Sequence, residues 1–317
     1  MVKATMEDPG RLAFLLVPGF SMMAFASAVE PLRVANRLSG RTLYTWRILS
    51  RDGEPVAASN GMLVIANARL DDWGDVTRIV VCAGFDPRLH DDRAVRSELR
   101  RCARAGIDLG AMDTGSFFLA WARLLDGYRA TVHWECLDSF QEQFPRVQAT
   151  PHLFEMDRDR FTCAGGTAAL DMMLHIIRLE HSHALAGAVS EQFIHAPIRS
   201  AQDAQRMTPA ARQGILHPKL ARAVTAMEAR LEEPLSCAEI CTSAGISSRQ
   251  LERLFLSRLG RTPARYYLEL RLQRARALLQ YSDLPVTRVA VACGFNSLAH
   301  FSRSYRSWSG KRPSAER

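Results

Sequence analysis

Two copies of one short pattern, at residues 238–263 and 287–313, constrain the fold of this chain more than any other feature. In each copy a short apolar segment ends at a glycine, Gly245 or Gly294, which can adopt the positive φ of a tight turn between two helices. A serine or asparagine then precedes a second segment that carries arginines. The pattern therefore predicts two helix-turn-helix units.

The second segment of the first copy has the pattern of a capped, amphipathic helix. Ser247 is followed three residues later by Gln250, which fits a capping box. One face collects Leu251, Leu254, Phe255 and Leu259, and the opposite face is left with Arg249, Glu252, Arg253 and Arg258. We expect the apolar face, and Phe301 and Tyr305 in the second copy, to lie in the core. The charged face would then be exposed to solvent, where it can contact DNA.

A helix predicted over 264–280 joins the two copies and places Leu268, Leu272, Ala275 and Leu279 on one face. At about 1.5 Å per residue, this helix spans roughly 25 Å. That length can hold two recognition helices near the ~34 Å spacing of successive major grooves on B-DNA. One chain could then read two adjacent grooves.

The positive charge of the chain is concentrated at its C-terminal end. The net charge is +8, and residues 217–317 contain 17 Lys and Arg against 8 Asp and Glu, whereas residues 1–216 contain 24 against 25. A basic domain joined to a nearly neutral one indicates an anion-binding module attached to a part that has a different kind of partner.

Composition argues against several other classes of protein. With 317 residues, the chain suits two domains that each bury a core. No apolar run reaches the roughly 18 residues that a membrane span needs, and the polar residues 1–11 do not form a secretory signal. The seven cysteines form no CxxC pair, so we expect reduced thiols in the cytoplasm, with neither a metal site nor a cofactor.

Residues 11–199 alternate strand-like and helical stretches, which is typical of an α/β fold with a parallel sheet. Strands are predicted at 12–18, 44–49, 78–84 and 107–112, with a helix after the first strand and another over 91–105. In such a doubly wound sheet, ligands bind where the strands end. The predicted organisation is a tail at 1–10, an α/β domain at 11–199, a linker at 200–216 and an all-α domain at 217–317.

The C-terminal domain resembles an AraC/XylS-type DNA-binding domain. The resemblance rests on the doubled motif, on SSRQLERLF at 247–255 and on GFNSLAHFSRSYRSWSGKRP at 294–313. It implies that exposed residues early in each second helix contact base edges of double-stranded promoter DNA. Those residues are Arg249, Glu252 and Arg253 in the first copy and Leu298, Ala299, Ser302 and Arg303 in the second.

These residue types suit base recognition unequally. Arg can grip guanine in two places and Glu can accept from cytosine, whereas Leu and Ala can contact only the thymine methyl group. We therefore expect more polar base readout from the first copy. Each arginine has an alternative role, because most protein–DNA hydrogen bonds go to the backbone. Arg253 could pair with Glu252 or with a phosphate, and Arg303 could clamp the DNA backbone.

The α/β domain contains a strand-to-helix turn within LGAMDTGSFFLA at 109–120, where one side chain is presented at the edge of the sheet. Together with LLDGYRATVHW at 124–134, this stretch resembles the PfpI-type, class I glutamine amidotransferase-like fold, a flavodoxin-like doubly wound sheet. In enzymes of that superfamily the turn presents a cysteine, and a histidine follows further along. His133 matches the histidine, but Asp113 stands in the place of the cysteine.

This replacement argues against an enzyme. A thiolate attacks carbonyl carbons readily, whereas a carboxylate is a poor acyl acceptor. None of the seven cysteines is placed to substitute, and Thr114 would need a base at its hydroxyl. An enzyme, in the form of an amidohydrolase-like protein with a DNA-binding tail, stays an alternative, since an Asp at such a turn can form esters in alkyl-transfer chemistry.

The two domains together resemble the GlxA-type transcriptional regulators over nearly the whole chain. Residues 20–40, the turn at 109–120 and AGGTAALDMML at 164–174 resemble the subgroup that senses arginine, glycine betaine or carnitine and activates catabolic genes. The resemblance implies a small amino acid or quaternary amine as effector. We also expect a homodimer and contact with RNA polymerase. A further alternative is a constitutive DNA-binding protein whose first domain only dimerises.

A ligand site is predicted where the strands of the α/β domain end. Its members are Glu30, Asp113, Thr114, His133 and Trp134. The carboxylates and the face of Trp134 would attract a cation, and the carboxylate of a zwitterion would need an N–H cluster or His133. Alternatively, Asp113 caps the following helix, Trp134 is core and His133 fills a hydrogen-bonding role. Asp171 is expected to pair structurally or to anchor the turn at 165–166.

Overall fold

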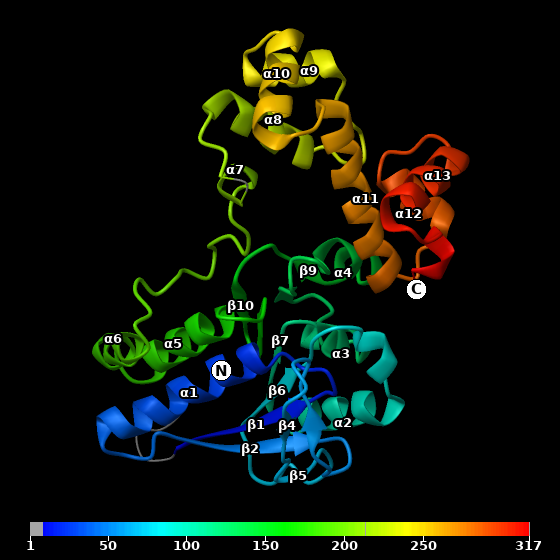
Figure 1. Ribbon diagram of the computed structural model, residues 1–317. Helices are drawn as coiled ribbons and strands as arrows, with labels where there is room; N and C mark the ends of the chain where they lie inside the picture. Colours follow the sequence, from blue (N-terminus) through cyan, green and yellow to red (C-terminus); the bar gives the residue numbers. More distant parts are fainter. Residues whose placement is uncertain (1–8, 213, 317) are drawn as a thin grey trace. The chain divides into compact units, whose positions relative to one another are not determined.

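The computed structural model describes residues 9–212 and 214–316, and the chain divides into two compact units between Gln205 and Arg206 (Figure 1). The first unit is α/β and the second is all-α, as the sequence predicts. Each unit has a hydrophobic core of its own. Within the described ranges, no helix combines the length and apolar character that crossing a bilayer requires.

The first unit is built on a seven-stranded sheet in the order β10-β11-β7-β6-β1-β2-β5. Its strands are β1 (Gly10–Leu16), β2 (Tyr44–Ser50), β5 (Ala68–Arg69), β6 (Arg78–Cys82), β7 (Asp108–Met112), β10 (Phe154–Asp157) and β11 (Arg160–Cys163). All neighbours run parallel except β10, which is antiparallel to β11. This order is the doubly wound, flavodoxin-like one. The first strand begins and ends two residues before the predicted limits.

Helices cover both faces of this sheet (Figure 1). On one face α1 (Met22–Ser39), α5 (Ala168–Glu180) and α6 (His183–Gln192) pack against one another, and on the other α2 (Arg93–Arg104) packs with α3 (Gly115–Trp121). β6 and β7 are buried along their whole length as a result, which explains their continuous apolar runs. Shorter elements complete the unit: β3 (Val56–Ala57), β4 (Leu63–Val64), η1 (Pro87–His90), β8 (Arg129–Ala130), α4 (Leu137–Gln143) and β9 (Gln148–Ala149).

A buried ionic network lies at the edge of the sheet where its parallel strands begin. Arg78, the first residue of β6, donates to Glu180 at the end of α5, and its Nε lies 3.7 Å from Oδ2 of Asp108, the first residue of β7. The hydroxyl of Tyr44 donates to Glu180 at 2.9 Å. The side chains of Arg78, Glu180 and Asp108 are 5–7% exposed. The network therefore ties β2, β6, β7 and α5 together out of contact with solvent.

The second unit consists of helices and contains both helix-turn-helix copies. Its elements are α7 (Pro209–Arg212), α8 (Pro218–Glu228), α9 (Cys237–Ala244), α10 (Ser248–Leu259), α11 (Pro263–Tyr281), α12 (Val286–Ala292), α13 (Leu298–Ser309) and η2 (Pro313–Ala315). The N-terminal half of α11 places Tyr266 and Tyr267 in the core of the first copy, and its C-terminal half places Leu272 and Leu279 in the core of the second. This one helix joins the two copies, as predicted.

The segment predicted as a linker, 200–216, is divided between the two units. Its first residues belong to the α/β unit: Ala201 accepts a backbone hydrogen bond from Leu153 at 3.0 Å, and the Gln205 side chain donates to the carbonyl of His152 at 2.8 Å. Further along, Arg212 pairs with Glu228 of α8 at 2.6 Å. The linker was predicted from the polar composition of this segment. Composition does not show that these polar groups form hydrogen bonds and ion pairs within each unit, so the predicted linker is longer than the one in the structure.

Removing the cation of the buried network should destabilise the first unit strongly. In Arg78→Met the carboxylates of Glu180 and Asp108 stay buried without their partner, a change that typically costs about 3–5 kcal/mol. Arg69→Gln, which breaks the exposed pair with Asp71, should cost less than about 1 kcal/mol. Urea unfolding followed by circular dichroism measures both, and equal losses for the two variants would contradict a buried, coupled network.

Candidate functional sites

Asp113 occupies a sharp turn between β7 and α3 at the carboxyl edge of the sheet. Its φ is 59°, in the left-handed region that few residues other than Gly, Asn and Asp adopt. Its backbone N–H donates to the carbonyl of Cys163 at 3.0 Å, which fixes the turn to the next strand. A Cβ at Gly165 would lie 2.7 Å from Oδ2 of Asp113, so the glycine leaves the space that this carboxylate fills. The turn has the geometry of a nucleophile elbow.

The pKa of Asp113 is raised to about 7, chiefly by burial and to a smaller extent by the negative charge of Glu135, whereas a hydrogen bond from the backbone N–H of Thr114 opposes the increase. No residue in the described ranges forms an ion pair with Asp113. The folded state holds more protons than the unfolded state between the ordinary pKa near 4 and the raised value near 7. Asp113 therefore lowers the free energy of unfolding as the pH rises through that interval.

Two further carboxylates lie near this turn. Besides burial, which is the largest cause, the charges of Asp113, Glu135 and Asp86 raise the pKa of the neighbouring Cys136 thiol. Asp86 follows β6, and its φ of 50° is again left-handed. The hydroxyl of Thr114 donates to the carbonyl of Gly84, so the loop after β6 is bonded to the turn after β7. Three carboxylates thus gather where the strands end.

The thiols nearest the turn are not nucleophiles. Burial raises the pKa of Cys163 to about 12 and holds that of Cys136 well above its ordinary value. Both therefore stay protonated near neutral pH, and a thiol is far less nucleophilic than a thiolate. Thr114 is 3% exposed, and its hydroxyl proton is held by a carbonyl. The Gly84 carbonyl therefore receives that proton in place of a catalytic base, and a contact of Thr114 with a ligand stays a prediction.

His133 and Trp134 lie on the loop after β8, and their rings are 5.3 Å apart. Burial lowers the pKa of His133, although Glu135, whose carboxylate is 3.9 Å from Nδ1, opposes this effect. The ring is therefore neutral at physiological pH. Trp134 is 37% exposed, so it can offer part of its face to a ligand. The loop also carries Glu135, which the sequence analysis did not select.

Glu30 and Asp171 have partners of their own. Glu30 lies halfway along α1 and pairs with Arg33 of the same helix at 2.6 Å, and its role in ligand binding stays a prediction. Asp171 is fully buried and accepts from His195 at 2.8 Å and from the guanidinium of Arg199 at 2.6 Å. The structural pairing predicted for Asp171 is confirmed.

Sequence analysis missed Phe85 and Asp86, in addition to Glu135. All three residues lie in loops at the carboxyl edge of the sheet, and Phe85 is 64% exposed. The loop after β6 could have been selected by the same rule that singled out Asp113, since ligands bind where parallel strands end. The candidate effector site therefore consists of Asp113 and Glu135 with Asp86, His133, Trp134 and Phe85.

The first helix-turn-helix has the local structure that its sequence predicts. Gly245 ends α9 with a φ of 66°, and Ser247 and Gln250 form the expected capping box at the start of α10. Leu251 and Phe255 are fully buried. In the second copy Ser297 caps α13, and Gly294 turns with a φ of 73° where a Cβ would lie 2.6 Å from Pro234. Phe301 and Tyr305 are core residues, as predicted.

The predicted base-contacting residues lie on the outer faces of α10 and α13. Those exposed to solvent are Arg249, Glu252, Arg253, Leu298, Ala299 and Arg303, and Ser302 is half-buried. Arg303 also lies beside a cavity between α11 and α13 that includes His300 and Trp308. Each helix therefore presents a face that could enter a groove.

The arginines of this unit fall into two groups. Arg261 and Arg265 pair with Glu269, Arg276 with Glu316, and Arg271 donates to the carbonyls of Cys293 and Gly294. Among the described residues, Arg249, Arg253 and Arg303 have no ion pair, and Arg253 is not bonded to Glu252. These three arginines lie on α10 and α13, where DNA contact is expected.

Comparisons with known proteins agree with both units. Residues 11–179 match the DJ-1/PfpI family, and residues 240–317 match a helix-turn-helix domain. Two transcriptional regulators of Pseudomonas aeruginosa are similar over nearly the whole chain. GbdR is 48% identical over 98% of this chain and 85% of its own length, and CdhR is 49% identical over 96% and 90%.

A solved structure is also similar to this chain, and the similar full-length proteins share one function. A crystal structure of an AraC family transcriptional regulator from Pseudomonas putida has a TM-score of 0.55 and 32% identity, and the match covers 58% of this chain and all of that one. The similar full-length proteins are transcriptional regulators. The chain thus belongs to the AraC family of helix-turn-helix transcriptional regulators that carry an N-terminal DJ-1/PfpI domain.

Proposed function

We propose that the α/β unit binds a small cationic or zwitterionic metabolite, an amino acid or a quaternary amine such as arginine, glycine betaine or carnitine. The observation that carries the proposal is the buried Asp113 carboxylate, which has no ion-pair partner among the described residues and lies near Glu135 and Asp86. A bound cation would supply the missing positive charge. The exposed rings of Trp134 and Phe85 suit a methylated ammonium group.

The same site is proposed to bind without catalysing a reaction. Asp113 stands where enzymes of the amidotransferase-like fold present a cysteine, and the nearest thiols are kept protonated by burial. A neutral His133 can donate one hydrogen bond to the carboxylate of a zwitterion. The site offers charge complementarity and hydrogen bonding but no competent nucleophile.

Binding would act on transcription by shifting the protein between two states. An effector can change the balance of these states only by as much as its affinities for them differ. We propose that the protein acts in the cytoplasm as a homodimer. The effector would alter the contact of α10 and α13 with promoter DNA and, through it, the recruitment of RNA polymerase to catabolic genes.

Titration calorimetry of the full chain with glycine betaine, carnitine and arginine tests the effector site. We expect Asp113→Asn to weaken binding about tenfold or more, because it removes a charge-assisted contact. Glu30→Gln is the matched control and should leave binding unchanged. The wild-type affinity should rise with pH through about 7, because a cation favours the ionised carboxylate whereas protons compete with it. The affinity of Asp113→Asn should lack this rise.

Three outcomes would contradict the proposal. Equal affinity of wild type and Asp113→Asn would place the ligand elsewhere. Absence of binding across a broad panel of amines and amino acids would favour a unit that only dimerises. Turnover of a ligand that is lost in Asp113→Ala would make the unit an enzyme.

Arg253→Ala should weaken binding to a DNA duplex that the wild type selects from a random pool by about 1–3 kcal/mol, with a smaller loss on random duplex of equal length. The reason is that a base contact discriminates between sequences, whereas a phosphate contact does not. Arg265→Ala, at an arginine that Glu269 engages, is the control and should change discrimination little. Fluorescence anisotropy measures both, and an equal loss on the two duplexes would make Arg253 a phosphate contact.

A further inference from the structure

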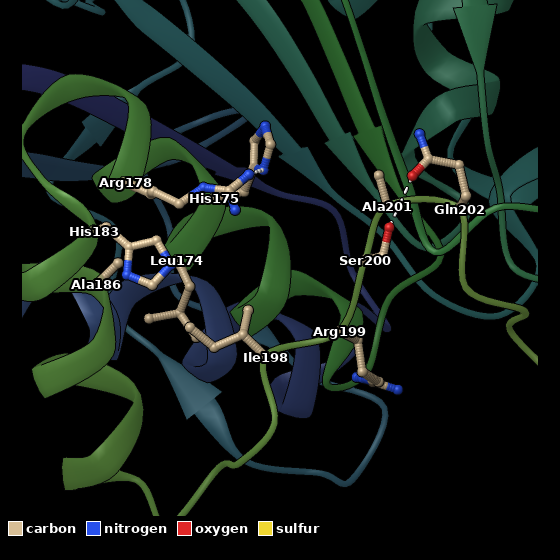
Figure 2. A pocket seen from close by; sticks show the side chains of 10 residues that line it. All are labelled: Leu174, His175, Arg178, His183, Ala186, Ile198, Arg199, Ser200, Ala201 and Gln202. Atoms are coloured by element: carbon tan, nitrogen blue, oxygen red, sulfur yellow. Dashed lines mark hydrogen bonds between the residues drawn. The ribbon is translucent and has the colours of Figure 1, made fainter.

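A cavity of about 470 Å³ lies between α5, α6 and residues 198–202 of the α/β unit (Figure 2). Its walls include Leu174, His175 and Arg178 of α5 and His183 of α6. None of the residues of the candidate effector site lines it. The proposed effector therefore leaves this cavity without an assigned role.

The polar side of the cavity presents hydrogen-bond donors. Arg178 extends toward the ring of His175 and donates to its Nδ1 at 2.8 Å (Figure 2). A guanidinium can only donate, so Nδ1 accepts and the ring proton of neutral His175 lies on Nε2. Burial and the nearby Arg178 lower the pKa of His175, which favours this neutral form. Nε2–H of His175 has no partner among the described residues, so it is available to a ligand.

The charge of the lining is positive. No Asp or Glu is among the lining residues, and Arg199, which also lines the cavity, is neutralised by the buried Asp171 at 2.6 Å. Arg178 is exposed, and its one described polar contact is with the uncharged ring of His175. Its charge is therefore not compensated within the cavity. A ligand that accepts hydrogen bonds and carries negative charge would compensate it.

The cavity also has apolar lining residues. Leu174, Ala186 and Ile198 contribute aliphatic side chains to the lining (Figure 2). A bare inorganic anion would make no use of these groups. An aliphatic chain that ends in a carboxylate suits both kinds of lining residue, because it can bury its methylene groups while its charge pairs with Arg178.

We propose that this cavity binds an aliphatic carboxylate, held by Arg178 and His175 at its charged end and by Leu174 and Ile198 along its chain. The site is separate from the proposed effector site and prefers the opposite charge. Residues 198–202 form one wall, and their continuation leads through Gln205 to the DNA-binding unit. A bound carboxylate would stabilise the docking of this segment, which already bonds to Leu153 and Asp171.

The experiment uses hexanoate as the probe on the full chain, with n-hexylammonium as a probe of similar length and opposite charge and with inorganic phosphate as the bare anion. Titration calorimetry should show saturable binding of hexanoate and none of n-hexylammonium. Arg178→Gln should weaken hexanoate binding about tenfold or more. Ile198→Glu, which places a carboxylate at an exposed position of the wall, should abolish it. Arg104→Gln, at an exposed arginine of α2, should leave it unchanged.

Hydrogen exchange of the full chain locates the bound probe. Hexanoate should slow amide exchange at residues 198–205 and along α5, and it should do so less in Arg178→Gln. The proposal is overturned if hexanoate does not bind, if n-hexylammonium binds as tightly, or if Arg178→Gln binds hexanoate like the wild type. Binding of phosphate without hexanoate would overturn the assignment of the apolar wall.

These outcomes are independent of the proposed effector. Asp113→Asn should bind hexanoate with unchanged affinity. Failure of betaine binding would leave the hexanoate site untouched, and failure of hexanoate binding would leave the effector site untouched. The two outcomes can be told apart because Asp113→Asn alters only the effector site and Arg178→Gln alters only the cavity. Loss of hexanoate binding in Asp113→Asn would contradict two separate sites.

Discussion

The left-handed turn at Asp113 is the constraint on which the chemistry of the α/β unit depends. A carboxylate at this position is buried by the sheet and fits only because Gly165 has no Cβ. Burying an ionised carboxylate is costly unless it is compensated, and here the compensation is a proton, as the pKa near 7 shows. The fold therefore holds a group that a cation can ionise at physiological pH. A cysteine at the same turn would supply nucleophilic chemistry, whereas this carboxylate supplies a charge.

The two edges of the parallel sheet differ in how their buried charges are compensated. At the edge where the strands begin, Arg78, Glu180, Asp108 and Tyr44 compensate one another almost completely out of solvent. At the edge where they end, Asp113, Glu135 and Asp86 have no matching cation among the described residues. The same residue types thus hold the sheet together at one edge and leave charge uncompensated at the other. This asymmetry supports the proposal that the α/β unit binds a cationic ligand at the edge where the strands end.

Local patterns in the sequence predicted the DNA-binding unit well. Capping boxes, glycine turns and apolar stripes act over a few residues, so Ser247, Gly245 and Phe255 have the predicted roles. The α/β fold and the turn at Asp113 followed from strand order. Pairings between distant segments were not accessible: periodicity does not show that Gln205 docks on His152, or that Arg178 and Ile198 share a cavity. The base-contacting residues and the effector site stay predictions.

The central claim is that the Asp113 carboxyl group has no cationic partner among the described residues until a ligand arrives, so that a proton compensates it in the free protein. Carbon-13 NMR titration of the aspartate carboxyl carbons, with Asp113→Asn used to assign the resonance, measures it directly. We expect a pKa near 7 in the free protein. When glycine betaine is bound, it should fall toward the ordinary value of about 4. A carboxyl that titrates near 4 in the free protein, or one that does not respond to betaine or any other amine, would contradict the account.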